Sequence, residues 1–90
     1  MQREKLLAVN DHFQLQYEEK QNCYVLLYPE GMVQLSFSAG EIMSLCDGTK
    51  SCEGIIGELT EKFSNDAIGS DVVEFLEEAI SRDWIVYHEA

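Results

Sequence analysis

Two glutamates, Glu30 and Glu41, are the residues whose types and spacing could provide a general acid and a general base. Such a pair needs two carboxyl groups held close to one substrate. Glu30, however, lies in "YPEG", where Pro29 favours a turn. Glu41 follows Ser38 by three residues, which is the spacing of a helix capping box. Both glutamates therefore have structural explanations, and the sequence does not favour catalysis by this pair.

Cysteine and histidine offer the other route to chemistry, as a nucleophile with its base or as metal ligands. Cys23, Cys46 and Cys52 are odd in number and include no Cys-x-x-Cys pair, and His12 and His88 lie near opposite ends of the chain. This pattern is typical of reduced thiols that pack as small hydrophobic groups, not of a disulfide framework or a zinc site. We therefore expect no catalytic residue, no metal site and no cofactor.

Length and charge restrict the classes of partner. The 90 residues predict a single domain spanning 1–90, which would bury only about 60–65% of its unfolded surface and leave little room for a deep catalytic cleft. The formal net charge of −11 opposes binding to nucleic acid and to anionic membranes.

Targeting signals are not indicated either. No apolar run approaches the about 18 residues that span a bilayer, and "MQREKLLAVNDH" lacks the apolar core of a secretory signal. We expect a cytoplasmic protein without nucleic-acid or membrane partners, in which residues 1–11 are flexible.

The N-terminal half carries the two-residue period of β-strands. "HFQLQYEE" alternates apolar and polar residues, "NCYVLLY" is richer in aromatic and branched residues, and the polar residues 19–22 between them suit a hairpin turn. After a turn at Pro29 and Gly31, "MVQL" predicts a short third strand. Strands joined this closely favour an antiparallel meander.

From Ser38 onward the period is helical. Ser38 is expected to cap a first helix that ends near Asp47, and Ser51 is expected to cap a second helix. After the linker "SNDAIGSD", Ser70 is expected to cap a third helix, and "WIVYH" predicts a final short strand or a packed tail. The residues expected to face inward from the third helix are Val72, Phe75, Leu76, Ala79 and Ile80.

These elements predict an α+β fold, with an N-terminal three-stranded antiparallel sheet followed by three helices, similar to a winged helix-turn-helix. A DNA reader needs several basic groups on its recognition helix, yet the third helix offers one arginine and four acidic residues. An acidic winged-helix interaction or regulatory domain remains the alternative function. An acyl carrier is disfavoured because its serine should follow an aspartate, whereas Ser70 precedes Asp71.

The run "VLLYPEGMVQLSFSAGEIMSLCDGTKSCEGIIGEL", followed by "DVVEFLEEAISRDWI", resembles the pyrroloquinoline quinone (PQQ) biosynthesis protein D family. The resemblance extends from Phe13 to Val86 and is strongest through "LLYPEGMVQL", "SAGEI" and "CDGT". One departure is Asp83, which stands where we would expect the family's glycine. A glycine there would suit a left-handed cap on the third helix, a conformation that aspartate tolerates better than most residues.

The resemblance implies a non-catalytic peptide chaperone, that is, a recognition element for a ribosomally made and modified peptide. It implies that the protein binds the precursor peptide of PQQ and presents it to a radical S-adenosylmethionine (radical SAM) enzyme, which cross-links a Glu and a Tyr of the peptide. The peptide would add as a strand to the third strand and lean on the third helix. The residues implied for binding are Met32, Val33, Gln34, Leu35, Val72, Val73, Phe75 and Leu76.

The unpaired edge of the third strand supports this hypothesis on physical grounds. "GMVQLSF" has no lysine, no inward charge and no proline after Gly31, so it lacks the usual protections of a sheet edge. A partner strand can therefore pair with it, which is β-augmentation. A second copy of the chain could use the same edge, and the resulting homodimer would compete with the peptide.

A proline in this strand, Val33→Pro, is predicted to weaken peptide binding more than Glu77→Ala does, because proline removes a main-chain donor. Titration of isotope-labelled amides with the peptide would test this site. Chemical-shift changes that avoid both residues 31–36 and the third helix would contradict it.

Overall fold

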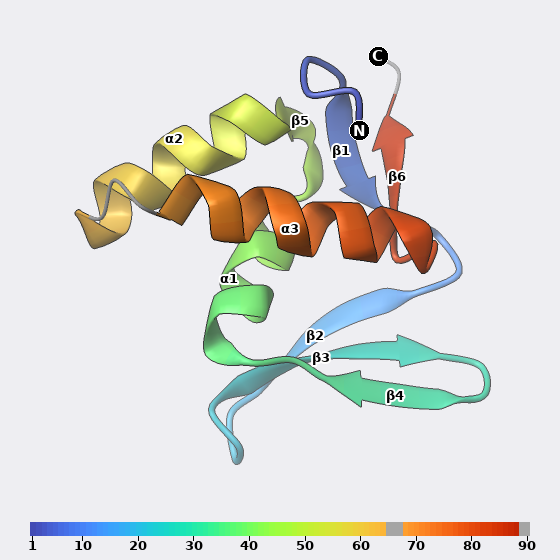
Figure 1. Ribbon diagram of the computed structural model, residues 1–90. Helices are drawn as coiled ribbons and strands as arrows, with labels where there is room; N and C mark the ends of the chain where they lie inside the picture. The colour runs from blue at the N-terminus through green and yellow to red at the C-terminus, as the bar shows by residue number, and fades with distance from the viewer. Residues whose placement is uncertain (65–67, 89–90) are drawn as a thin grey trace.

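The chain folds into two small antiparallel sheets and three helices, as seen in a computed structural model that describes residues 1–64 and 68–88. The sheets have the strand orders β5-β1-β6 and β2-β3-β4, and α3 crosses between them (Figure 1). The elements are β1 (Leu6–Val9), β2 (Gln14–Glu18), β3 (Cys23–Tyr28), β4 (Gly31–Gln34), α1 (Phe37–Ser44), β5 (Asp47–Ser51), α2 (Cys52–Phe63), α3 (Ile68–Ser81) and β6 (Ile85–His88). Within the described residues, no helix combines the length and apolar character needed to cross a membrane.

The sheet of β2, β3 and β4 is the predicted meander, and the prediction is confirmed. Strand β2 pairs with β3 from Gln14↔Leu27 to Glu18↔Cys23. Strand β3 pairs with β4 from Val25↔Gln34 to Tyr28↔Gly31, so the turn at Pro29 joins them as expected.

The second sheet was not predicted. Strand β1 pairs with both β5 and β6, and Leu7 in its centre is fully buried. The N-terminal segment is further tied down by Gln2, whose N–H donates to the Tyr87 hydroxyl at 2.8 Å. The expectation that residues 1–11 are flexible is therefore wrong for β1. Its pairing partners lie about forty and eighty residues away along the chain, so no local pattern announces the strand.

Strand β5 begins at Asp47, where the sequence predicted only the end of the first helix. Its sequence, "DGTKS", has no apolar residue, and Gly48 takes a left-handed φ of 85°. The pairing register with β1 shifts between Leu7 and Ala8, as in a β-bulge. Glycine suits this position because its positive φ carries no Cβ penalty.

Serines begin the first two helices, although the first is not the serine predicted. The N-cap of α1 is Ser36, whose Oγ accepts from the Ala39 N–H at 3.2 Å, so Ser38 lies inside the helix and the predicted capping box is wrong. Ser36 has the extended backbone that a cap requires. Ser51 is confirmed as the cap of α2, accepting from the Gly54 N–H at 3.3 Å.

The third helix starts earlier than predicted. It already includes Ile68, so Ser70 lies in its first turn and does not cap it. The predicted linker falls partly on residues 65–67, which lie outside the described residues. Of the residues predicted to face inward, Val72, Leu76 and Ala79 are fully buried, and Phe75 and Ile80 are half-buried.

The last turn of α3 forms a left-handed cap at Asp83, whose φ is 63°. The Trp84 N–H donates to the Ala79 carbonyl at 2.9 Å and the Asp83 N–H to the Ile80 carbonyl at 3.0 Å, which is the Schellman pattern. Asn10 Nδ2 donates to the Asp83 carbonyl at 2.8 Å and ties the turn to the end of β1. Aspartate therefore occupies the left-handed position at which we expected the family's glycine.

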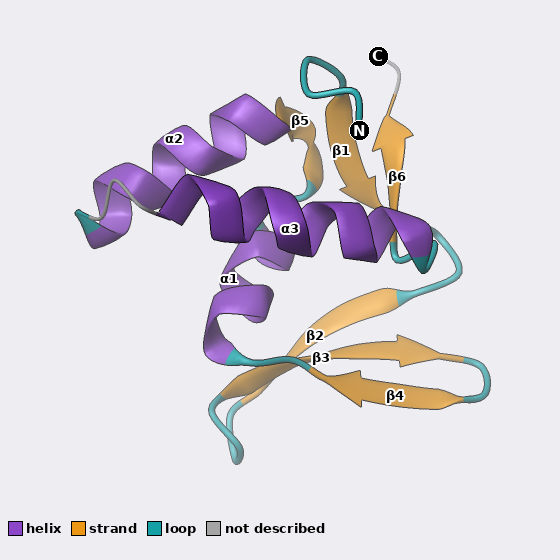
Figure 2. Cartoon of the chain, viewed as in Figure 1, coloured by secondary structure: helices purple, strands orange, loops and turns teal. Residues whose placement is uncertain are grey.

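A single apolar core joins both sheets to the helices. Its buried members are Leu7, Leu26, Leu35, Ile42, Met43, Cys46, Cys52, Ile55, Leu59, Val72, Leu76, Ala79 and Ile85. Helix α1 lies so close to β3 at Gly40 that a Cβ added there would be only 2.7 Å from Cδ2 of Tyr24. Figure 2 shows the helices filling the space beside and between the two sheets.

The buried position of Leu7 gives a test of β1. Leu7→Ala is predicted to lower the free energy of unfolding by about 2–5 kcal/mol, since it removes a fully buried leucine from a packed core. The neighbouring change Leu6→Ala should cost less, because Leu6 is only half-buried. Urea denaturation followed by circular dichroism would measure both. Equal, small losses would contradict the pairing of β1 within the sheet.

Candidate functional site

Strand β4 has one unpaired side. Among the described residues it pairs only with β3, through the register that ends in Tyr28↔Gly31. The Leu35 N–H donates to the Tyr24 carbonyl at 3.0 Å, which fixes the phase of the hydrogen-bond ladder. Main-chain groups alternate sides along an antiparallel strand. Those of Val33 therefore point to β3, and those of Met32 and Gln34 point to the open edge.

This alternation changes the meaning of a proline in β4. The Val33 N–H belongs to the ladder with β3, so Val33→Pro would damage the sheet itself and would not report on the open edge. The sequence could not give the phase of the ladder, because that phase depends on which residues of β3 and β4 exchange hydrogen bonds. Gln34 is the position where proline removes an N–H from the open edge.

A groove with a volume of about 550 Å³ lies between β4 and α3. Val33 forms its β4 side, Phe75 its apolar centre on α3, and Trp84 one end. Figure 1 shows α3 passing alongside the β2-β3-β4 sheet. The remaining lining residues are Asp71, Glu74, Glu78 and Arg82.

The α3 wall of the groove is charged unevenly. Asp71, Glu74 and Glu78 follow one another at helical spacing and share a face. Arg82 Nη2 lies 2.9 Å from Glu78 Oε1, and its guanidinium carbon lies 5.5 Å from the centre of the Trp84 ring. Within the described part of the chain, no cation lies at ion-pair distance from Asp71 or Glu74. The α3 wall of the groove is therefore anionic beside Phe75 and carries its cation at the Trp84 end.

The four site residues predicted at positions 32–35 do not all face the groove. Val33 is half-buried and lines the groove. Met32 is 55% exposed, and Gln34 is also exposed, with its Nε2 donating to Cys23 Sγ at 3.4 Å. Leu35 is a core residue. The side chain of Val33 and the open-edge backbone of its neighbours are thus the parts of this segment that an added strand can reach.

The predicted residues of α3 also divide. Phe75 lines the groove, whereas Val72 and Leu76 are fully buried in the core. Val73 lies on another side of the helix, where it lines a neighbouring cavity with Ile56 that shares Glu74 and Glu78 with the groove. Helical spacing alone did not reveal which inward residues reach the surface, because that depends on where the two sheets cover the helix.

Sequence reasoning missed the acidic wall of the groove and its Trp84 end. No binding role was assigned to the acidic residues of α3, although their spacing at positions 71, 74 and 78 places them beside Phe75. Trp84 was predicted only as part of a final strand or tail, and the Schellman turn brings it to the end of the groove. The expectation of a left-handed residue at position 83 was the signal from which this could have been found.

The groups considered first for chemistry have other contacts. Glu41 Oε2 lies 2.7 Å from Lys62 Nζ, so it links α1 to α2. Glu30 is exposed in the β3–β4 turn. Burial raises the pKa of the Cys46 thiol to about 12, with the nearby Asp47 charge adding to the effect. Burial also raises the pKa of Cys52. In the described residues, His, Cys, Asp and Glu form no group of three that could hold a metal ion.

The fold and the groove define a small α+β domain with an open sheet edge beside a helix. The family model "Coenzyme PQQ synthesis protein D (PqqD)" matches residues 23–85, and the chain belongs to this family, as its sequence led us to expect. The PqqA binding protein of Azotobacter vinelandii is 51% identical over 77 residues, covering 84% of each chain. That of Methylococcus capsulatus is 40% identical over 85 residues, covering 94% of this chain and 91% of its own.

Two solved structures share the fold. The solution NMR structure of the PqqD truncation of Methylobacterium extorquens PqqCD, described as a functional and stand-alone RiPP recognition element, has a TM-score of 0.72 at 22% identity, covering 96% of this chain and 99% of its own. The heterocyclase TruD has a TM-score of 0.66 at 18% identity, covering 91% of this chain but 11% of that one. The α+β architecture with antiparallel sheets is thus that of a known recognition element.

Thiol reactivity tests the buried positions of Cys46 and Cys52. At about pH 8, iodoacetamide is predicted to alkylate Cys23 first, because Cys46 and Cys52 are buried with raised pKa values. Mass spectrometry should detect one modified thiol in the folded protein and three after denaturation. The variant Cys23→Ala should take up almost no reagent while folded. Modification of all three thiols at equal rates would contradict the buried positions.

Proposed function

We propose that this protein binds the PqqA precursor peptide by accepting it as an additional strand on β4, beneath α3. The observation that carries the proposal is the open edge of β4 beside an apolar-centred groove. The relatives named PqqA binding protein support the identity of the peptide. The recognition-element fold supports binding as the activity.

The geometry of β4 accounts for how a peptide would be held. The N–H and C=O groups of Met32 and Gln34 supply main-chain hydrogen bonds, which give affinity without reading sequence. Alternate side chains of an added strand would then point towards Phe75 and Val33. Specificity would come from this apolar contact and from the carboxylates of Asp71 and Glu74 at the groove wall.

In this proposal the protein is a chaperone and not an enzyme. It would hold the peptide in an extended form and present it to a partner enzyme, which the family resemblance implies to be a radical SAM enzyme that joins a Glu to a Tyr. The free thiols Cys23, Cys46 and Cys52 suit a reducing compartment such as the cytoplasm. We interpret α1, α2 and α3 with their strands as a winged helix-turn-helix arrangement used for peptides instead of DNA.

The open edge gives the decisive test. Gln34→Pro is predicted to weaken binding of synthetic PqqA by about tenfold or more, because it removes a main-chain donor and blocks strand addition. Gln34→Ala should bind nearly as well as the unmodified protein, since it loses the same side chain but keeps the N–H. Fluorescence anisotropy with a labelled peptide would measure the dissociation constants.

A proline on the opposite edge of the sheet is the matched control. By the same alternation the Tyr17 N–H points to the open side of β2, so Tyr17→Pro should leave the affinity unchanged. Equal losses for Gln34→Ala and Gln34→Pro, or an equal loss for Tyr17→Pro, would refute strand addition at β4. Analytical ultracentrifugation would show whether Gln34→Pro instead dissolves a homodimer built on the same edge.

A further inference from the structure

We propose that a second pocket, between α1, the end of α2 and the start of α3, receives a bulky apolar side chain of the same peptide. This side chain would belong to the part of the peptide that extends beyond the segment paired with β4. The inference rests on the proposed function, since it assumes that a peptide lies on β4.

The pocket has an apolar interior and a polar rim, with a volume of about 320 Å³. Its interior is formed by one or two residues from each of the three helices, namely Ile42, Leu59, Phe63, Ile68 and Phe75. The rim includes Ser36, Ser38 and Asp71. The volume lies near the lower end of the about 300–1,000 Å³ typical of ligand sites, so it suits one or two side chains.

Continuity with the groove identifies the occupant. Asp71 and Phe75 line both cavities, so the two meet along α3. Strand β4 ends at Gln34, and Ser36 at the pocket rim begins α1 immediately afterwards. A peptide strand that extends past the end of β4 would therefore come near Ser36 and the rim of the pocket. A separate ligand would have to share Phe75 with the peptide.

The interior of the pocket favours an apolar side chain, because the two carboxylates that line the pocket do not occupy its centre. Glu41 is already paired with Lys62 at 2.7 Å, and Asp71 lies at the rim shared with the groove. The Phe63 ring is 39% exposed and meets Phe37 edge to face, with ring centres 6.0 Å apart. An apolar side chain in the pocket would cover part of the exposed Phe63 ring and remove its unfavourable contact with water.

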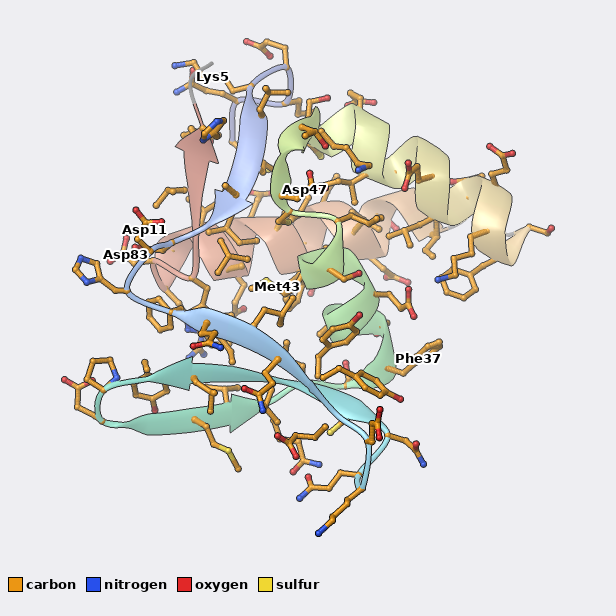
Figure 3. The ribbon with its side chains drawn as sticks, turned by 180° about the vertical axis from the view of Figure 1, so that it is seen from behind. Lys5, Asp11, Phe37, Met43, Asp47 and Asp83 are labelled. Carbon is orange, nitrogen blue, oxygen red and sulfur yellow. The ribbon has the colours of Figure 1, made fainter. Side chains whose placement is uncertain are left out.

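The two aromatic residues provide matched variants. Phe63→Ala removes a wall of the pocket, and it is expected to weaken binding of synthetic PqqA by about tenfold. Phe37→Ala removes the other ring of the same pair, but Phe37 is 64% exposed, does not line the pocket and points outward from α1 (Figure 3). It should change the affinity by less than about twofold. Circular dichroism of both variants would establish that they fold.

A second variant fills the pocket instead of opening it. Ser38 is exposed on α1 at the pocket rim, so Ser38→Phe keeps the core intact while placing a ring over the opening. It is also expected to weaken binding about tenfold. Agreement between a variant that removes the wall and one that blocks the entrance would support the pocket independently of any effect on folding.

Peptide variants identify the side chain that enters. Each apolar residue of synthetic PqqA is changed to alanine in turn and titrated against the unmodified protein and against Phe63→Ala. At one peptide position, the change to alanine should weaken binding to the unmodified protein but should weaken binding to Phe63→Ala very little. This non-additivity is the coupling expected of two groups in contact.

The outcomes separate this inference from the proposed function. If the unmodified protein does not bind PqqA, the proposed function fails and the inference fails with it. If PqqA binds and Gln34→Pro weakens it, but Phe63→Ala behaves like Phe37→Ala and no peptide position couples to Phe63, the pocket proposal alone is overturned. A Phe63→Ala variant that turns a dimer into a monomer with unchanged peptide affinity would assign the pocket to a second copy of the chain.

Discussion

Burial of one face of α3 is the constraint on which the rest of the structure depends. Val72, Leu76 and Ala79 are withdrawn from water in the core that the helix shares with both sheets, and this fixes the rotation of the helix about its axis. Phe75 then lies at the boundary between core and surface, facing β4. The same rotation places the neighbouring acidic residues Asp71, Glu74 and Glu78 at the border of the groove. The helix thus supports the core with one face and forms a wall of the groove with the next.

Local patterns were sufficient for the parts of the fold that local interactions stabilise. The alternation in β2, the aromatic and branched run of β3 and the Ser51 cap all act over a few residues, and the structure has each of them. Strands β1 and β5 were not predicted, because their pairing joins segments far apart in the chain and because β5 consists of residues that usually form turns. The cap of α1 was misplaced because two serines stand two residues apart and only the tertiary path of the chain selects Ser36.

The candidate site was predictable as a pair of elements but not as a set of side chains. The family resemblance and the unprotected edge indicated β4 and the third helix, and the groove lies between them. Leu35, Val72 and Leu76 are nevertheless in the core, because an apolar residue on the correct element can face either the core or the groove. Deciding between these faces needs the hydrogen-bond phase of β4 and the rotation of α3. Both are set by contacts between elements that no single segment encodes.

The central position of β1 has a consequence for the architecture of larger proteins. Because β1 pairs with β6 from Leu6↔His88 to Val9↔Ile85, the first and last strands lie side by side, away from β4 in both views (Figures 1 and 3). A polypeptide joined to either strand would therefore start away from the β4 edge. The same fold makes up about a tenth of the heterocyclase TruD chain. This layout suits a module that can be spliced into a multidomain enzyme without loss of its exposed edge.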